Sequence, residues 1–273
     1  MKSILITGSN GYIARNIRKY FKDYKLFLTD RSNLNLLNSN DVNNFFSGKY
    51  FDVVLHTAVS GGSRLNSDDS AVFYNNILMH YNLMKNNENF GKYINLGSGA
   101  ELDRSKNISF DSHNIESFPT DHYGLSKNII ARTGYTLENF YNIRIFNVFN
   151  QDELPTRMMR TSITNYINKE KIVIHQNRYM DFMYFDDFAK ILNYIITHND
   201  CPKTINCSYQ EKYLLTDIAE IINNLDNHKV EIKIQNKELG FSYIGKSDIE
   251  KLNIKLDGLK NGIEKCYQYF LNE

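Results

Sequence analysis

Short apolar runs alternate with longer amphipathic segments over about the first 150 residues of the chain. Runs such as Val53-Val54-Leu55 are apolar at successive positions, which is typical of strands buried on both faces. The pattern predicts five strands: Ser3–Thr7, Lys25–Thr29, Asp52–Thr57, Lys92–Leu96 and Asn142–Phe146. It predicts helices between them: Tyr12–Phe21, Asp41–Phe46, Ser70–Asn86 and Tyr123–Phe140, the last capped by Thr120 or Asp121.

This alternation predicts an α/β fold, a Rossmann-type doubly wound parallel sheet with helices on both faces. The regularity loosens after Phe149 into irregular segments and two helices, Phe185–Thr197 and Leu259–Leu271. We therefore expect one domain over residues 1–150 and a smaller region over residues 151–273, interleaved with the first. The smaller region is expected to fold onto the carboxyl ends of the strands, where ligands bind in such sheets.

Composition excludes several classes of partner. The 273 residues carry a formal charge of +1, with Lys and Arg dispersed, which indicates neither a nucleic-acid nor a membrane partner. No apolar run approaches the roughly 20 residues of a membrane span, and the apolar N-terminal run is too short for a signal peptide. We expect a cytoplasmic protein.

No metal site is predicted. Cys201, Cys207 and Cys266 form no C-x-x-C pair, which argues against a zinc site and a disulfide framework. The histidines near the motifs described below also lack metal-like spacing, and we expect them to be structural or solvent-exposed: His56, His80, His113 and His122.

A glycine turn follows the first predicted strand and opens the first helix. Its spacing is G-x-x-G-x-x-A over Gly8, Gly11 and Ala14. Gly8 allows the tight turn, Gly11 lets backbone approach a pyrophosphate, and Ala14 permits close packing of helix on sheet. We expect dinucleotide binding by the turn and the start of the helix: Gly8, Asn10, Gly11, Tyr12 and Ile13.

The end of the second strand carries Asp30 and Arg31 side by side. An acidic side chain at this position binds the ribose hydroxyls of NAD, whereas an arginine accommodates the 2′-phosphate of NADP. The residues alone leave both cofactors open.

Tyr123 and Lys127 lie four residues apart at the start of a predicted helix, so both side chains leave the same face. A nearby ammonium favours phenolate and lowers a tyrosine pKa from about 10 towards neutrality. Such a tyrosine can protonate a carbonyl oxygen as hydride reaches the carbon. Ser98, at the end of the preceding strand, could hydrogen-bond to the same oxygen.

Together these motifs resemble the extended short-chain dehydrogenase/reductase family, also described as NAD-dependent epimerases/dehydratases, over essentially the whole chain. The resemblance takes in the glycine turn, Ser98, Tyr123 with Lys127, Arg144–Phe149 and Met183–Asp187. Within the family the chain is most similar to GDP-L-fucose synthase-type ketoreductases, on Arg31–Leu37, Gly61-Gly62, Phe73–Asn76 and Leu96–Ser98.

The resemblance implies catalysis by Ser98, Tyr123 and Lys127 on a nucleotide sugar, and a homodimer formed through the helices 70–86 and 123–140. It places Arg31 on an arginine of an NADPH-using enzyme, which favours NADP(H), with NAD(H) possible. It adds further cofactor contacts: Thr57, Ala58 and Asn76, beside Asp30, Arg31, Tyr123 and Lys127. It implies substrate contacts from five residues: Ser98, Gly99, Asn147, Arg157 and Arg178.

Two departures narrow the expected reaction. GDP-L-fucose synthase epimerises before it reduces, with a cysteine and a histidine as acid and base. Those positions are Ala100 and, approximately, Arg157 here, and neither side chain can deprotonate carbon next to a ketone. Met180 stands where relatives often carry a phosphate-binding arginine, with Arg178 two residues earlier.

We therefore predict NADPH-dependent reduction of the 4-keto group of a nucleotide-linked 4-keto-6-deoxy sugar, without epimerisation, in the synthesis of surface-glycan precursors. Two alternatives stay open: a 4-epimerase that retains NAD, and a non-catalytic NADP-binding protein on the same fold. A 4,6-dehydratase is disfavoured, because similar enzymes place an Asp-Glu pair just after the serine, where Ala100 and Glu101 follow here.

Overall fold

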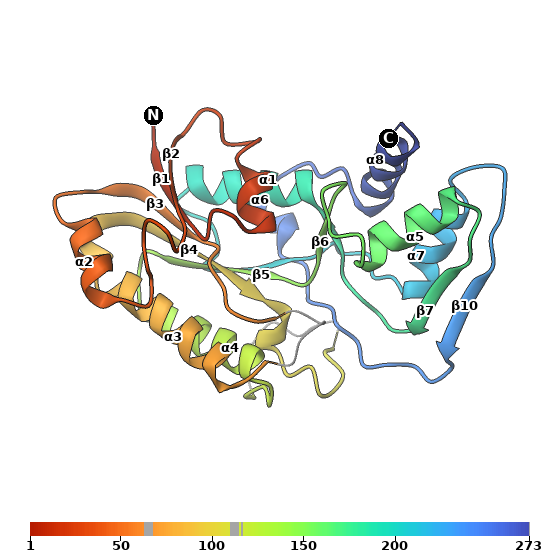
Figure 1. The fold of residues 1–273 in the computed structure, drawn as a ribbon, viewed down its shortest axis with the longest axis horizontal. Coiled ribbons are helices and arrows are strands. Elements are labelled where there is room, and N and C mark those ends of the chain that lie inside the picture. Colours follow the sequence, from red (N-terminus) through yellow and green to blue (C-terminus); the bar gives the residue numbers. More distant parts are fainter. Residues whose placement is uncertain (63–67, 110–114, 116, 273) are drawn as a thin grey trace. The chain divides into compact units, whose positions relative to one another are not determined.

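A computed structural model describes residues 1–62, 68–109, 115 and 117–272 (Figure 1). His113 therefore lies outside the described residues. The chain forms two compact units. The first comprises residues 1–103, 114–144 and 193–205, and the second comprises residues 104–113, 145–192 and 206–273.

A six-stranded sheet forms the centre of the first unit, in the order β2-β1-β3-β4-β5-β9 (Figure 1). Strand β1 pairs in parallel with β2 and β3, and β3 pairs in parallel with β4. The strand bounds are Ser3–Thr7 (β1), Lys25–Thr29 (β2), Phe51–His56 (β3), Phe90–Ser98 (β4), Phe140–Ile145 (β5) and Thr204–Cys207 (β9). The predicted Rossmann-type fold is confirmed. The strand order reverses direction between β1 and β3, where ligands bind in doubly wound sheets.

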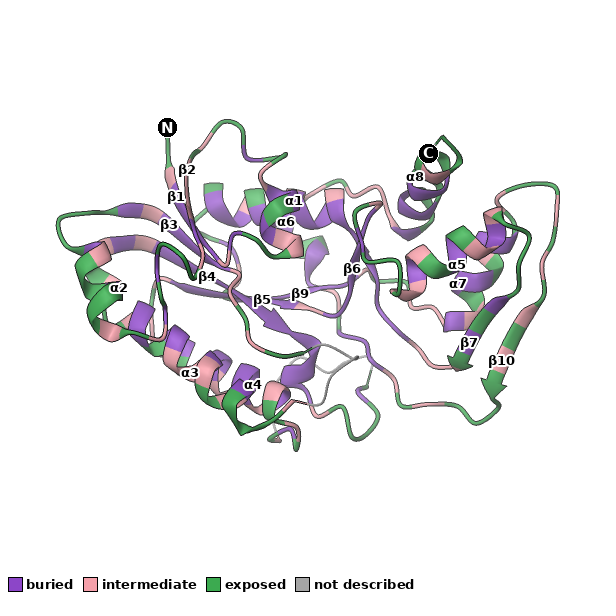
Figure 2. Ribbon diagram, viewed as in Figure 1, coloured by how far each residue is buried: buried purple, intermediate pink, exposed green. Residues whose placement is uncertain are grey.

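Helices cover both faces of this sheet. Helices α2 (Ser39–Phe46), α3 (Ser70–Met84) and α4 (His122–Gly134) pack on one face, over a cluster of buried side chains that includes Val54 and Phe140. Helix α1 (Tyr12–Ile17) and the last turns of α6, residues 193–197, lie on the other face (Figure 1). Strands β3, β4 and β5 are almost entirely buried, whereas the edge strand β2 is partly exposed (Figure 2).

Short polar side chains set the starts of three of these helices. Asn38 caps α2, Asp69 caps α3 and Asp121 caps α4, each by accepting hydrogen bonds from backbone N–H groups of the first turn. Such caps satisfy amides that have no partner inside the helix. Of the two caps considered for α4, the structure uses Asp121.

The predicted end of α4 was wrong. The helix ends at Gly134, and Phe140 begins β5 instead of closing the helix. A Cβ on Gly134 would lie 2.0 Å from the Phe140 ring, so the ring packs directly on the bare glycine. Apolar spacing alone does not distinguish this turn from a continuing helix. Helix α1 likewise ends at Ile17, four residues before the predicted Phe21.

The second unit contains small elements that the sequence pattern left as irregular. Helices α5 (Met158–Ile167) and α7 (Leu215–Asn223) lie beside the parallel strands β7 (Ile172–Gln176) and β10 (Ile232–Asn236). Strand β7 alternates buried and exposed positions, because only one face of this two-stranded sheet is covered. A second parallel pair joins β6 (Val148–Phe149) and β8 (Met183–Tyr184). Helices α6 (Phe185–Thr197) and α8 (Leu259–Leu271) match the predicted bounds.

Asp187 organises the second unit. Its buried carboxylate accepts hydrogen bonds from the Tyr209 hydroxyl at 2.6 Å, from the Asp257 N–H at 2.8 Å and from the Gly258 N–H at 2.9 Å. Lys190 neutralises it at 3.0 Å. These bonds join the start of α6 to the start of α8.

A buried ion pair organises the first unit. Glu101 lies in the 3₁₀ turn Gly99–Glu101 that follows β4, and Arg144 lies on β5. The Arg144 Nε donates to Glu101 Oε2 at 2.9 Å, and neither side chain is exposed to solvent. A buried charge that loses its partner is costly, whereas removing both charges leaves no unpaired charge behind.

We expect Arg144→Met to lower the free energy of unfolding by about 3–5 kcal/mol, because it leaves the Glu101 carboxylate buried and uncompensated. The double variant Glu101→Gln/Arg144→Met should recover most of this loss. Urea unfolding of both variants and the wild type measures the difference. A double variant no more stable than Arg144→Met would contradict this account.

Candidate functional site

The glycine turn after β1 is shaped by close contact with the segment after β3. Gly8 has φ +64°, and a Cβ there would lie 2.6 Å from the Cα of Ala58. The Gly11 N–H closes the turn by donating to Gly8 O at 2.9 Å. Any side chain at position 8 would therefore clash and strain the backbone.

This turn borders a pocket of about 610 Å³ in the first unit. The pocket is lined by seven of the predicted cofactor residues: Gly8, Asn10, Gly11, Asp30, Arg31, Thr57 and Ala58. Apolar side chains that the sequence did not single out line it as well: Leu34, Leu36, Leu37, Val59 and Met79. Polar groups with apolar walls suit a ligand that combines phosphates with an aromatic base.

Five other predicted cofactor residues do not line this pocket: Tyr12, Ile13 and Asn76, and also Tyr123 and Lys127, which are described below. Tyr12 and Ile13 lie in the first turn of α1. Asn76 on α3 is buried, and its side chain accepts from Ser60 N at 2.8 Å and donates to Ser60 O and to the Ser126 hydroxyl. The structure therefore gives Asn76 a bracing role between the segment after β3 and helix α4.

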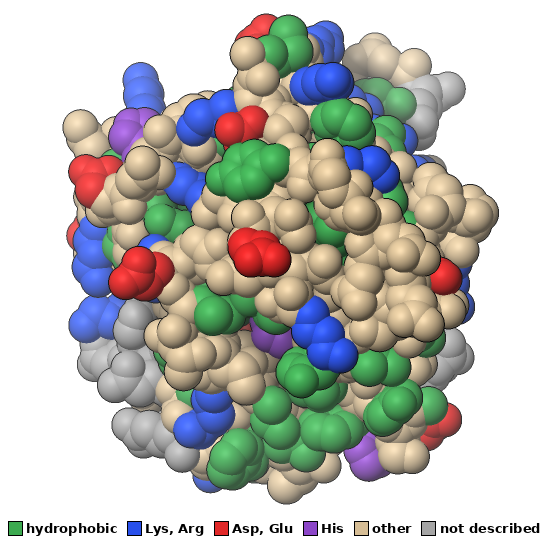
Figure 3. Space-filling view, turned by 90° about the vertical axis from the view of Figure 1, so that its left-hand side faces the viewer, with side chains coloured by type: hydrophobic (Ala, Val, Ile, Leu, Met, Phe, Trp, Pro, Cys, Tyr) green, Lys and Arg blue, Asp and Glu red, His purple; other side chains and the backbone are tan. Residues whose placement is uncertain are grey.

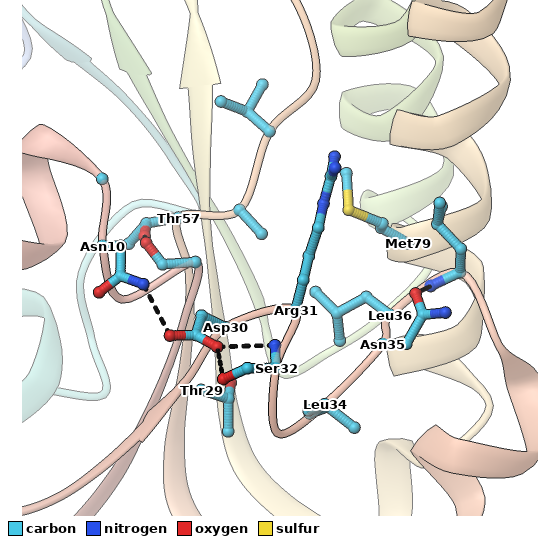
Figure 4. A pocket seen from close by; sticks show the side chains of 15 residues that line it. Asn10, Thr29, Asp30, Arg31, Ser32, Leu34, Asn35, Leu36, Thr57 and Met79 are labelled. Atoms are coloured by element: carbon cyan, nitrogen blue, oxygen red, sulfur yellow. Dashed lines mark hydrogen bonds between the residues drawn. The ribbon is translucent and has the colours of Figure 1, made fainter.

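Asp30 and Arg31 lie differently in the pocket (Figure 4). The Asp30 carboxylate accepts from Asn10 at 2.7 Å and from the Ser32 N–H and hydroxyl at 2.8 and 2.5 Å. These hydrogen bonds hold the pKa of the Asp30 carboxyl below its ordinary value, and those from Ser32 have the largest effect. The Arg31 side chain extends across the pocket towards Met79, and no described residue accepts a hydrogen bond from its guanidinium.

The first turns of α4 bring Tyr123 and Lys127 to the carboxyl end of β4. Lys127 Nζ donates to Leu96 O at 2.9 Å and lies 5.9 Å from the centre of the Tyr123 ring. A Cβ on Gly124 would lie only 2.7 Å from Ala100 O, so the helix presses on the turn that begins at Ser98. The structure thus brings the three predicted catalytic residues to one edge of the sheet.

Lys127 is buried, and its surroundings are electrostatically unusual for a lysine. Burial lowers its pKa to about 8, while the Glu101 carboxylate acts in the opposite direction. Burial lowers the pKa of His80 to about 3 and that of His56 well below its usual value, and the Lys127 charge lowers both further. Both histidines are therefore neutral, as expected for structural residues, and His56 pairs with the Thr7 hydroxyl at 2.8 Å.

Gly62 contacts Tyr123 and was not identified as a site residue from the sequence. Its φ is +76°, and a Cβ there would lie 2.7 Å from the Tyr123 ring. Its N–H donates to Asp68 at 3.0 Å. The Gly61-Gly62 pair was the one available sequence signal for this contact.

The remaining predicted substrate residues divide between the units. Gly99 follows Ser98 in the first unit, whereas Asn147, Arg157 and Arg178 lie in the second. Asn147 is buried and donates to Asp181 O at 2.8 Å. Arg157 pairs with Glu153 at 3.4 Å, and Arg178 donates to Gln176 at 3.0 Å.

Comparison with known proteins decides the family. The sequence model of the NAD dependent epimerase/dehydratase family matches residues 4–208. The chain belongs to the NAD-dependent epimerase/dehydratase family. The predicted family is therefore confirmed. No curated protein sequence matches the chain.

Solved structures of similar fold include several members with named activities. A GDP-mannoheptose C4 reductase from Campylobacter jejuni with NADP bound superposes with a TM-score of 0.79 at 20% identity, covering 99% of this chain and 98% of that one. A GDP-L-fucose synthetase from Naegleria fowleri gives 0.79 at 17% identity, covering 99% and 94%. A UDP-N-acetylglucosamine 4-epimerase from Methanobrevibacter ruminantium gives 0.82 at 20% identity, covering 99% and 98%.

The residues of this family member fit a nicotinamide dinucleotide. The bare Gly8 lets the turn pack against Ala58, and Arg31 faces the pocket without a protein partner among the described residues. Across the part of the chain that the structure describes, no helix could span a membrane and no cluster of three metal-ligating side chains occurs. Charged side chains of both signs are dispersed over the face shown in Figure 3.

The lowered pKa of Lys127 predicts a pH-dependent stability. Below pH 8 the folded and unfolded states both hold this proton, and folding bears the full cost of burying the charge. Between pH 8 and 10.5 the unfolded state binds more protons, so stability rises with pH. We expect the unfolding free energy of the wild type to rise by about 3 kcal/mol relative to Lys127→Met over this range.

Denaturant unfolding across this pH range measures the difference, and Lys22→Met, at an exposed lysine, is the matched control. If the difference in unfolding free energy between the wild type and Lys127→Met does not change with pH, burial of the Lys127 ammonium does not destabilise the folded state.

Proposed function

We propose that the protein reduces the 4-keto group of a nucleotide-linked 4-keto-6-deoxy sugar with NADPH, without epimerising the sugar. The observation that carries this proposal is the convergence of Tyr123, Lys127 and Ser98 at the carboxyl end of β4, in the unit that holds the dinucleotide pocket. The C4 reductase and the GDP-L-fucose synthetase of similar fold support this class of substrate.

NADPH, when bound, supplies the hydride. Tyr123 donates its phenolic proton to the carbonyl oxygen as that oxygen becomes an alkoxide, and the Ser98 hydroxyl hydrogen-bonds to the same oxygen. Lys127 stabilises the tyrosinate left behind, because its ammonium is held close to the phenol by α4 and by Leu96 O. Gly99, Asn147, Arg157 and Arg178 are proposed to contact the nucleotide sugar.

From the side chains of Ala100 and Arg157 we infer that there is no epimerising step. Ala100 cannot take a proton, and Arg157 keeps its charge and is paired with Glu153. Without an acid and a base at these positions, the configuration next to the ketone is retained.

NADP(H) is favoured over NAD(H) by the contrast between Asp30 and Arg31. The oxygens of Asp30 already accept three hydrogen bonds from Asn10 and Ser32, whereas the guanidinium of Arg31 lies in the pocket. A guanidinium binds phosphate oxygens strongly, so Arg31 is proposed to bind the 2′-phosphate.

NADPH oxidation against a panel of GDP-, dTDP-, CDP- and UDP-linked 4-keto-6-deoxy sugars tests the activity, with NMR of the product. We expect Tyr123→Phe to lower kcat about 10²- to 10⁴-fold while the protein still binds NADPH, because the transferred proton is lost and the other cofactor contacts remain. Tyr81→Phe, at an exposed tyrosine of α3, is the control.

Three results would contradict this assignment. Near-wild-type turnover by Tyr123→Phe would remove the tyrosine from the mechanism. Tightly held NAD in the purified protein, with C4 epimerisation and no net NADPH oxidation, would identify a 4-epimerase. Cofactor binding without turnover of any keto sugar would support a non-catalytic protein.

We expect Arg31→Ala to weaken NADPH binding about 10- to 100-fold and to leave NADH binding nearly unchanged, because only NADPH carries the 2′-phosphate. Titration of both cofactors by fluorescence measures this, with the exposed Arg15→Ala on α1 as control. Equal losses for both cofactors would exclude Arg31 as the phosphate ligand.

A further inference from the structure

We infer that Glu101 is a positioning residue for the Ser98, Tyr123 and Lys127 set. Its carboxylate holds the backbone at Ser98 in place, and its backbone joins this turn to the helix that carries Tyr123 and Lys127. The catalytic consequence rests on the proposed function, whereas the contacts of Glu101 are a property of the folded protein itself.

Glu101 shapes the turn that presents Ser98. Its Oε1 accepts from the Ser98 N–H at 2.9 Å, while the Ser98 hydroxyl oxygen accepts from Ala100 N at 3.1 Å. This reciprocal pair is a capping box on the 3₁₀ turn. The carbonyl oxygen of Glu101 also accepts from the Asn128 side chain on α4 at 2.8 Å. The same residue therefore links the serine turn to the helix of Tyr123 and Lys127.

The surroundings of the carboxylate fix its position. Asn142 donates to both of its oxygens, at 3.1 and 2.9 Å, and Arg144 donates to Oε2 at 2.9 Å. Gly97 leaves the space that it occupies, since a Cβ there would lie 2.3 Å from Oε1. A fully buried, ion-paired carboxylate that accepts four hydrogen bonds from three neighbouring groups has one geometry, which is what a positioning residue requires.

The groups around Lys127 come from four elements. Leu96 O on β4 accepts its hydrogen bond, His56 on β3 and His80 on α3 are neutral, and Tyr123 lies on its own helix. Glu101 raises the pKa of Lys127 against the larger, opposing effect of burial. Without this carboxylate the ammonium would lose its proton at a lower pH, and with it the charge that stabilises a tyrosinate.

A purely structural role for Glu101 is separable from this electrostatic one. Glu101→Gln keeps an oxygen that can accept from Ser98 N but removes the charge, whereas Arg144→Met keeps the carboxylate and removes its partner. Both variants should lower stability, because each breaks the buried ion pair between Glu101 and Arg144. Only the first should make Lys127 easier to deprotonate.

The test measures the pH at which folded Lys127 loses its proton, and it needs no turnover. The unfolding free energy of proteins with and without Lys127→Met is compared across pH, in the wild-type, Glu101→Gln and Arg144→Met backgrounds. In each background, the stability of the protein with Lys127 should rise with pH relative to that of its Lys127→Met counterpart. We expect this rise to begin at least about one pH unit lower in the Glu101→Gln background than in the wild type. In the Arg144→Met background it should begin no lower than in the wild type. An unchanged onset in Glu101→Gln would overturn the inference.

If Glu101→Gln does not fold, the double variant Glu101→Gln/Arg144→Met supplies the background, because it removes both buried charges. The same downward shift is expected there, since Glu101 is the charge that acts on Lys127. An unchanged onset in this double background would equally overturn the inference.

A second measurement ties the contact to catalysis. The alkaline limb of the pH profile of kcat/KM for NADPH-dependent reduction should move to lower pH in Glu101→Gln. The shift should equal the shift in the pH at which the unfolding free energy begins to rise. A limb that stays in place while the onset shifts would show that Glu101 does not act on the catalytic proton. If no keto sugar is reduced by the wild type, the proposed function fails, and the stability measurement still decides the role of Glu101.

Discussion

The sheet edge that carries Ser98, Tyr123 and Lys127 depends on a buried carboxylate, Glu101, and on Arg144, the cation paired with it. The pair with Arg144 joins the turn after β4 to β5, and the backbone of Glu101 accepts from Asn128 on α4. Three elements that are distant in sequence thus meet at one group. Because the pair is not exposed to solvent, partners inside the fold determine its position. The position of Ser98 is in turn determined by the hydrogen bond from its N–H to the Glu101 carboxylate.

The pocket beside the glycine turn depends on a different contact, the close approach of two backbone segments. Gly8 and Ala58 follow strands β1 and β3 and come into direct contact, because a glycine lacks the atom that would separate them. The pocket opens beside this contact, at the point where the strand order reverses. Bare backbone forms one wall, Leu34, Leu36 and Met79 form another, and Arg31 supplies the charge.

Much of the fold was predictable because its signals are local. Buried parallel strands have continuous apolar runs, and the predicted bounds of β1, β2, α6 and α8 agree with the structure. The prediction was wrong where tertiary packing outweighs periodicity, as at Gly134, where the Phe140 ring ends a helix that apolar spacing would continue. It was incomplete in the second unit, because α5, α7 and the short strands have weak periodic signals.

The sequence by itself determined the family and which side chains are available for the proposed chemistry. The glycine turn, the serine and the tyrosine–lysine spacing are recognisable because each motif is local and each residue type is required by its role. Only the tertiary structure decided how these groups are tuned. Long-range contacts pair Asp30 with Asn10, leave Arg31 facing the pocket, press Gly62 on Tyr123 and bury Glu101 beside Arg144. Burial and charge act through space, and residues 101, 127 and 144 share an environment that their order along the chain does not reveal.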